Sequence, residues 1–127
     1  MFLRPILTFI TVMAVFLSFA PADVPAGAFE LKKGAIDYFA IGNRHFSKLH
    51  GSTTEESLAL AVEAYDMALK HNPHFADAYN NRGVAHFLLG NFEAAMANYQ
   101  AALALDPDSS NIMSNMRIMQ WEMRGMK

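Results

Sequence analysis

The sequence predicts an all-α protein, a short solenoid in which two similar helix pairs are followed by a fifth, capping helix. Three observations lead to this prediction. Apolar residues recur at helical spacing, a block of residues recurs after 34 positions, and glycine or proline interrupts the helical pattern at intervals. One helix pair cannot bury its apolar stripe alone, so a repeated pair is typical of proteins that stack such units.

The N-terminal residues 1–22 have the pattern of an export signal. A single arginine precedes an apolar run from Pro5 to Ala20, and Ala-Pro-Ala ends the segment in the form that signal peptidase cleaves. We expect cleavage after Ala22, with Ala28 as an alternative cut and 23–29 as a flexible linker. The other interpretation is an uncleaved membrane anchor, although this run is shorter than the roughly 20 apolar residues that a bilayer span needs.

The charge and cysteine content narrow the class of protein. The chain has 10 basic and 12 acidic residues, a net charge of −2, so it lacks the basic surface that nucleic-acid binding requires. It has no cysteine, which excludes disulfides and thiolate metal sites. We therefore expect an exported, periplasmic protein held together by helix packing, with membrane contact only if the N-terminal segment stays attached.

An internal repeat gives the domain organisation. Four residues recur after 34 positions: Ala61, Tyr65, Ala68 and Pro73 return as Ala95, Tyr99, Ala102 and Pro107. Upstream residues recur after 41 positions: Tyr38, Gly42 and His45 return as Tyr79, Gly83 and His86. The difference, 41 minus 34, places a seven-residue insertion between the two helices of the first copy.

These residues resemble the tetratricopeptide repeat, a helix pair with small, aromatic and proline residues at set positions. The second copy, 76–109, fits from end to end, with Arg82 where leucine is usual and His86 where tyrosine is usual. The resemblance implies a domain over 30–127, with a first repeat at about 35–75 and a capping helix at 110–127.

Local signals predict where the helices begin and end. The apolar spacing predicts a first helix over about 30–50. A capping box of Thr53 and Glu56 is expected to open the second helix, and Gly90 to close the third. The resemblance implies that the inner glycines pack on alanines, Gly42 on Ala61 and Gly83 on Ala95. Arg82 is expected to extend its stem along the core or to pair with an acidic neighbour.

The resemblance also implies a concave surface that binds a partner. The residues expected there are Phe39, Asn43, Phe46, Asn80, Asn81, Val84, Phe87 and Trp121. Amides both donate and accept hydrogen bonds, so they suit an extended peptide; the alternative is that they are merely solvated. In a variant of the family that binds C-terminal carboxylates, three positions are basic. Here these are Phe39, Asn111 and Asn115, so no carboxylate clamp is expected.

We therefore expect a non-enzymatic adaptor or assembly factor that binds a protein or peptide, without cofactor or metal. His71 and His74 flank a turn but lack a third ligand. The last helix has an apolar stripe, expected to cap the solenoid: Ile112, Met116, Met119, Met123 and Met126. The alternative is a structural component of an envelope assembly that self-associates through this methionine-rich helix.

Overall fold

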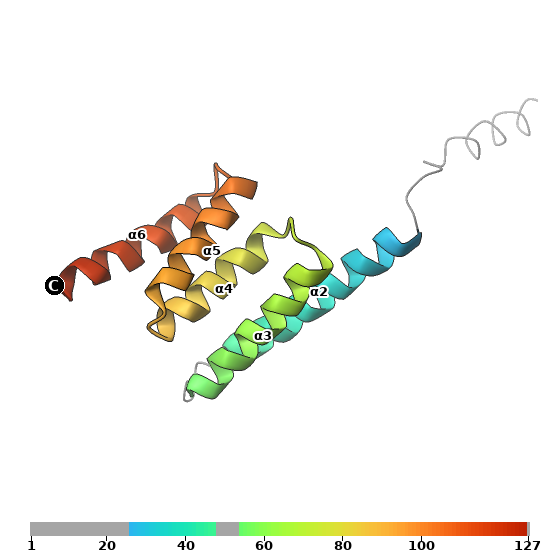
Figure 1. Cartoon of the computed structure of the whole chain (residues 1–127), viewed down its shortest axis with the longest axis horizontal. Coiled ribbons are helices and arrows are strands. Elements are labelled where there is room, and N and C mark those ends of the chain that lie inside the picture. The colour runs from blue at the N-terminus through green and yellow to red at the C-terminus, as the bar shows by residue number, and fades with distance from the viewer. Residues whose placement is uncertain (1–25, 48–53, 127) are drawn as a thin grey trace, which may run out of the picture.

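The computed structural model describes residues 26–47 and 54–126, with side chains from residue 32 onward, and this part of the chain is all helical (Figure 1). The helices are α2 (Ala26–Ser47), α3 (Glu55–His71), α4 (Ala76–Leu88), α5 (Phe92–Leu105) and α6 (Ser110–Gly125). The predicted all-α fold is confirmed. None of these helices is long and apolar enough to span a membrane. The predicted export signal lies outside the described residues.

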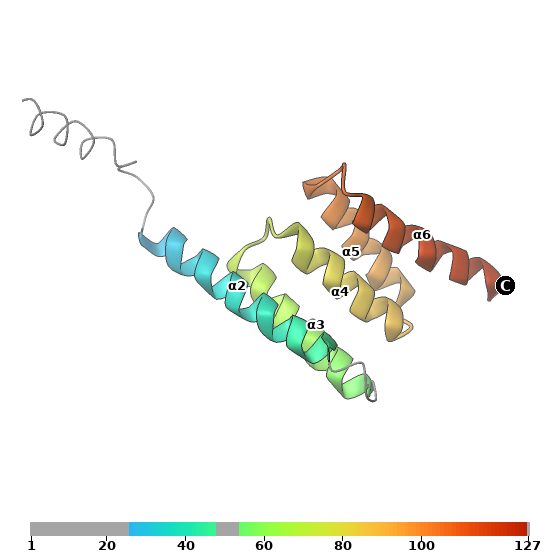
Figure 2. The same ribbon diagram turned by 180° about the vertical axis from the view of Figure 1, so that it is seen from behind.

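The helices pack as two pairs and a cap. α2 lies beside α3, α4 lies beside α5, and α6 runs along α5 at the other end of the molecule (Figures 1 and 2). We refer to α2, α4 and α6 as the inner helices, because each is the first helix of its unit. The methionine stripe of α6 faces inward, with Ile112 and Met119 buried and Met116 and Met123 packed against the same cluster. The predicted capping role of this stripe is therefore confirmed, except at Met126, which is exposed.

Two glycines allow the paired helices to approach closely, and tyrosine rings lie nearest to them. A Cβ at Gly42 would lie 2.5 Å from the Tyr65 ring, and one at Gly83 would lie 2.9 Å from the Tyr99 ring. The rings of the second helix, and not Ala61 or Ala95, are therefore nearest to the two glycines. A tyrosine on the second helix of each pair reaches back across the interface, and the expected packing of the glycines on Ala61 and Ala95 stays a prediction.

The first helix begins earlier than the sequence indicated. α2 starts at Ala26, so residues 26–29, expected as linker, are helical. Alanine has the highest helix propensity, and a proline directly before the first turn is compatible with a helix start, so the Pro/Ala/Gly-rich composition was misleading.

The cap of α3 is shifted by one residue from the predicted capping box. Thr54 is the N-cap, and its Oγ1 accepts a hydrogen bond from the backbone nitrogen of Ser57 at 3.4 Å. Glu56 is therefore the second residue of the helix and not the third, which a capping box requires, and Thr53 lies outside the described residues. The negative charge of Glu56, with that of Glu55, favours the helix N-terminus.

The seven-residue insertion is divided between a helix and a connection. α3 starts at Glu55, six residues before Ala61, whereas α5 starts at Phe92, three residues before Ala95. Three of the seven residues (six minus three) therefore lengthen α3 by almost one turn. The other four fall between Ser47 and Glu55, mostly outside the described residues.

Gly90 ends α4 as predicted. Its φ is +79°, a left-handed conformation that glycine adopts without a steric cost. The backbone nitrogen of Gly90 donates to the carbonyl of Phe87 at 3.0 Å, and that of Asn91 donates to His86 at 2.9 Å. This pair of bonds satisfies two carbonyls at the helix end and turns the chain directly into α5.

Candidate partner-binding face

Four asparagine side chains connect the inner helices through a chain of hydrogen bonds, which we call the amide ladder (Asn43, Asn80, Asn81 and Asn115). The Nδ2 of Asn115 donates to Oδ1 of Asn80 at 3.0 Å. The Nδ2 of Asn80 donates to Oδ1 of Asn81 at 3.2 Å, and the Nδ2 of Asn81 donates to Oδ1 of Asn43 at 2.9 Å. The ladder thus joins α6 to α4 and α4 to α2.

All three bonds of the ladder have the same direction, from α6 toward α2. Within the described part of the chain, the Nδ2 of Asn43 and the Oδ1 of Asn115 make no hydrogen bond. Neither atom is fully buried, so each keeps some contact with solvent. The ladder therefore presents a donor on α2 and an acceptor on α6.

Tyr65 of α3 fixes the α2 end of the ladder. Its hydroxyl donates to Oδ1 of Asn43 at 2.8 Å, so this oxygen accepts two hydrogen bonds. Burial raises the pKa of Tyr65 to about 12. The hydroxyl is therefore protonated at neutral pH, and it holds the Asn43 oxygen inward and the amide nitrogen outward.

The three predicted asparagines are thus brought together, but they do not have equal access. Asn80 is only 4% exposed, so its side chain supports its neighbours and does not face solvent. Asn43 and Asn81 are half-buried. Asn115 was considered only as a position lacking a positive charge, although its place one repeat length after Asn81 indicated that it would continue the same helix face.

The predicted apolar residues serve partly as packing. Phe39 lies against the rings of Phe75 and Tyr65, with centroids 4.7 and 5.8 Å away. Val84 and Phe87 are half-buried and pack against the cluster that α5 and α6 form.

Phe46 is half-buried, and Trp121 is 75% exposed on α6. No hydrogen bond of the described residues links Trp121 to the amide ladder.

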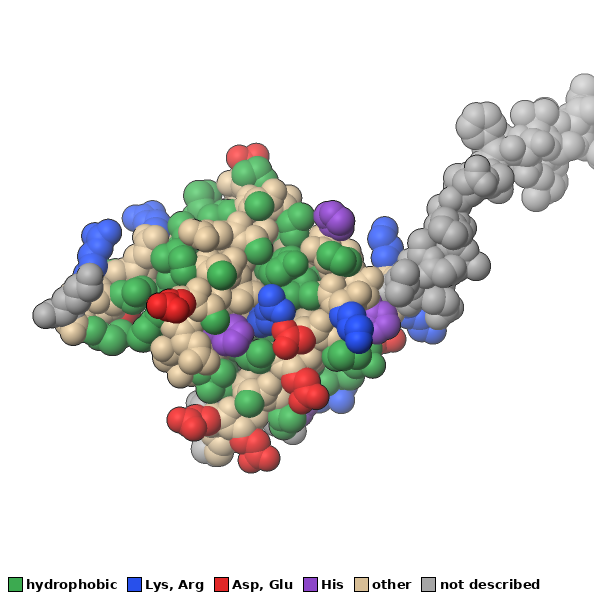
Figure 3. Space-filling view, in the orientation of Figure 1, with side chains coloured by type: hydrophobic (Ala, Val, Ile, Leu, Met, Phe, Trp, Pro, Cys, Tyr) green, Lys and Arg blue, Asp and Glu red, His purple; other side chains and the backbone are tan. Residues whose placement is uncertain are grey.

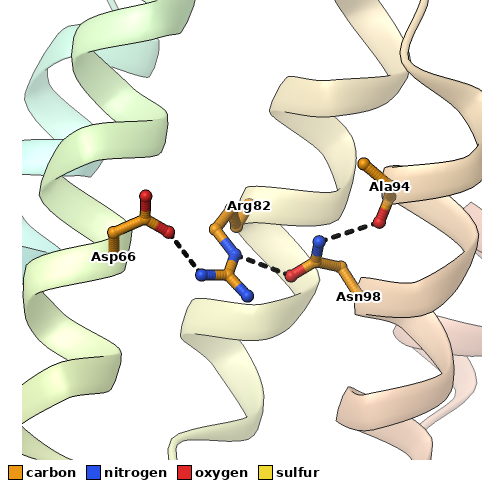
Figure 4. Close-up of polar contacts among 4 residues, drawn as sticks. All are labelled: Asp66, Arg82, Ala94 and Asn98. Carbon is orange, nitrogen blue, oxygen red and sulfur yellow. Dashed lines mark hydrogen bonds and ion pairs between the residues drawn. The ribbon is translucent and has the colours of Figure 1, made fainter.

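On another side of α4, Arg82 joins three helices (Figure 4). Its Nη1 pairs with Asp66 of α3, and its Nε donates to Oδ1 of Asn98 of α5 at 2.7 Å. The Nδ2 of Asn98 in turn donates to the carbonyl of Ala94 at 2.8 Å. The guanidinium also lies 5.4 Å from the centre of the Tyr79 ring. The predicted pairing of Arg82 with an acidic neighbour is confirmed.

His86 lies near this pair, in a setting that favours its neutral form. Burial and the charge of Arg82 lower its pKa, and Asp66 opposes this effect. In the space-filling view, basic, acidic and histidine side chains meet near the middle of this face (Figure 3). The side chains described from residue 32 onward include no group of three histidine, aspartate or glutamate residues placed to hold a metal ion.

Comparison with known proteins identifies the repeats. Residues 76–109 match the family model described as tetratricopeptide repeat, and residues 55–90 match a second model described as TPR repeat. The first match has the same bounds as the second sequence copy. The two matches together cover α3, α4 and α5.

Curated relatives share part of this region. The chain is 36% identical over 61 residues to a protein named Protein SGT1 homolog from Oryza sativa subsp. japonica, covering 48% of this chain and 17% of the relative. It is 32% identical over 74 residues to the Homo sapiens protein of that name, covering 58% of this chain and 20% of the relative.

A third relative is the Homo sapiens Protein O-mannosyl-transferase TMTC1, at 33% identity over 76 residues, with 60% of this chain and 9% of the relative covered. The chain therefore spans a fifth or less of the length of these three relatives.

Proposed function

Because this chain belongs to the tetratricopeptide repeat family, we propose that it is a non-enzymatic interaction module that binds an extended segment of a partner protein along its inner helices. The observation that carries the proposal is the amide ladder, which offers a donor on α2 and an acceptor on α6. An extended peptide has both groups on its backbone at regular spacing, so it complements a face with one of each.

The ladder also favours binding that depends little on the ligand's side chains. Its three internal bonds position Asn43 and Asn115 before a ligand arrives, so little side-chain freedom is lost on binding. Phe46, half-buried on α2, supplies apolar contact near the Asn43 end. We expect this face to accept different partner sequences, as an adaptor or assembly factor requires.

The expected ligand is an internal segment of a partner chain and not its C-terminus. Of the three positions that would need cations to hold a carboxylate, Phe39 packs against two aromatic rings and Asn115 is bonded into the ladder. Asn111, the third, is exposed but uncharged. A terminal carboxylate would lose hydration at this face without gaining an ion pair.

Peptide selection followed by matched substitutions tests this proposal. Binding peptides are first selected from a random phage-displayed library on the full chain. Calorimetry then measures their affinity for wild type, for Asn43→Ala/Asn81→Ala and for Asn111→Ala. Loss of the Asn43 donor, and of the Asn81 side chain that positions it, is expected to weaken binding at least about tenfold. Asn111→Ala, an exposed asparagine outside the ladder, is expected to bind like wild type.

Equal affinity of the ladder variant and wild type would remove the proposal, as would failure to select any peptide. Circular dichroism and melting temperature of each variant separate a lost contact from a lost fold.

The site of action is proposed from the N-terminal sequence alone. We propose export to the periplasm, with cleavage after Ala22. Terminal sequencing of the native protein tests this. A start at Asp23 supports cleavage, whereas a start at Met1 in the membrane fraction supports an anchored module.

A further inference from the structure

Helix α6 has two large exposed apolar residues on the side that faces away from the core, Ile118 and Trp121. Its inner side carries Ile112 and Met119, 2% and 0% exposed. The opposite side carries exposed residues in steps of four, three and four, which we call the outer seam: Ser114, Ile118, Trp121 and Gly125. Trp121 is 75% exposed and Ile118 is 53% exposed. A stripe with this spacing is the pattern by which one helix packs along another.

The internal repeat shows what these positions do elsewhere in the chain. Ile118 and Trp121 stand one repeat length after Val84 and Phe87 on α4. There the equivalent side chains are half-buried, because α5 and α6 cover them. The outer seam thus has the residue types of a covered helix–helix contact, but no helix of the described residues lies over it.

The charged residues beside the outer seam indicate which helix can pack against it. Arg117 and Glu122 lie on opposite sides of the outer seam. Within the described residues, neither of these two side chains forms an ion pair. In a parallel pair of helices, the residue directly before a seam residue lies opposite the residue five positions later on the other helix. A second copy of α6 would therefore place Arg117 opposite Glu122 of the partner subunit, twice by symmetry.

The shape of this region suits such an approach. α6 lies at the edge of the molecule, and its C-terminal end extends beyond α4 and α5 (Figures 1 and 2). A shallow hollow of about 740 Å³ runs along its outer side and includes Ser114, Ile118 and Trp121. Gly125, at the far end of the seam, has no atom within 4 Å of the place where a Cβ would be, so another backbone can come close.

We propose that two copies of this chain associate through the outer seam of α6, with the two α6 helices parallel. Ile118 and Trp121 stack on their equivalents, and two Arg117–Glu122 pairs flank them. The antiparallel arrangement is disfavoured because it brings Arg117 against Arg124 of the second copy. Of the amide ladder, Asn115 lies on α6 at the edge of the outer seam, whereas Asn43, Asn80 and Asn81 lie on α2 and α4.

Sedimentation of the full chain tests the association. The interface has two layers of apolar side chains, Ile118 and Trp121, so it is small and the dimer is expected to be weak. The protein concentration is therefore varied from about 10 µM to about 1 mM. Trp121→Glu and Arg117→Glu are expected to raise the dimer dissociation constant at least about tenfold. The double variant Arg117→Glu/Glu122→Arg exchanges the charges and is expected to restore association. Arg44→Glu, which reverses an exposed charge on α2, is the control and should change nothing.

Cross-linking tests the orientation, and the absence of natural cysteine makes it simple. In the parallel pair, position 114 faces itself, so Ser114→Cys is expected to form a disulfide rapidly under mild oxidation. Met113→Cys, one residue away and turned off the seam, should remain monomeric on a non-reducing gel. A wild-type chain that stays monomeric at the highest concentration would overturn the proposal, and so would a dimer in which Ser114→Cys cross-links no faster than Met113→Cys.

Discussion

The Nε of Arg82 donates to the Oδ1 of Asn98 across 2.7 Å, and this contact ties α4 to α5. The other end of the same guanidinium pairs with Asp66 on α3. A residue that departs from the usual leucine of the repeat therefore joins helices of both repeats. The two partners differ in exposure, because Asn98 is 7% exposed and the Asp66 side chain is 54% exposed.

Substitution of Arg82 is expected to cost more stability than substitution of Asp66. Arg82→Ala leaves the buried oxygen of Asn98 without its donor, which costs about 1 to 3 kcal/mol. Asp66→Ala removes an exposed ion pair and should cost less than about 1 kcal/mol. Urea unfolding followed by circular dichroism measures both values. Equal losses would mean that the ion pair, and not the buried amide, is the main stabilising contact.

The two inner glycines are expected to resist substitution by alanine, although alanine is normally the better helix former. Gly42→Ala would force its methyl group against the Tyr65 ring, and Gly83→Ala would do so less severely against Tyr99. Each should destabilise the chain by about 1 to 3 kcal/mol, Gly42→Ala more. Gly125→Ala, where the added methyl meets nothing within 4 Å, is the control for unfolding measurements at low protein concentration. Stabilisation by Gly42→Ala would contradict the packing described.

The turn after α4 gives a test of backbone conformation without a steric contribution. Gly90 has a φ of +79°, and no atom lies within 4 Å of an added Cβ. Gly90→Ala should therefore lower the free energy of unfolding by about 1 to 2 kcal/mol, through backbone strain alone. Gly90→Asn should lower it less, because asparagine tolerates the left-handed region better. Thermal unfolding that ranked alanine above asparagine would argue against a left-handed cap.

The buried tyrosines predict a loss of stability in alkali. Burial raises the pKa of Tyr65 and of Tyr99 to about 12 in the folded chain, against 10.0 for a free side chain. The unfolded chain therefore loses these protons first as pH rises, so the free energy of unfolding falls between pH 10 and pH 12. Each tyrosine contributes up to about 2 to 3 kcal/mol to this loss.

Tyr99→Phe isolates one contribution. The Tyr99 hydroxyl makes no hydrogen bond within the described residues, so this variant should match wild type at pH 7 and show a smaller loss between pH 10 and pH 12. Tyr65→Phe removes the hydrogen bond to Asn43 and should already cost about 0.5 to 1.5 kcal/mol at pH 7. Unfolding curves that fall equally steeply for Tyr99→Phe and wild type would contradict the pKa assignment.

Local sequence patterns predicted the repeat and most helix ends, because these depend on residues close together in the chain. Gly90 illustrates this: a glycine after an apolar run predicts a left-handed cap whatever the rest of the molecule does. The cap of α3 was displaced by one residue because Thr53 and Thr54 are chemically equivalent neighbours. Only the backbone conformation decides which of them becomes the N-cap, and Thr54 has the extended conformation of that position.

The candidate site was predicted less completely, because side-chain directions are not contained in repeat positions. The sequence placed Asn43, Asn80 and Asn81 on the inner helices, but it did not indicate that they bond to one another or that Asn80 is buried. The same limit applies to Gly42. Its spacing predicted a close neighbour, whereas the identity of that neighbour depends on how the Tyr65 ring is oriented.

The amide ladder also determines how binding would respond to salt. Its four side chains carry no net charge, but their hydrogen bonds all run the same way, so their amide dipoles add to a net dipole. Such a face does not attract counter-ions. Dissolved ions screen exposed charges over about 10 Å at 0.1 M, but they have little effect on short contacts between neutral dipoles. A partner held by this face would stay bound over wide changes in ionic strength.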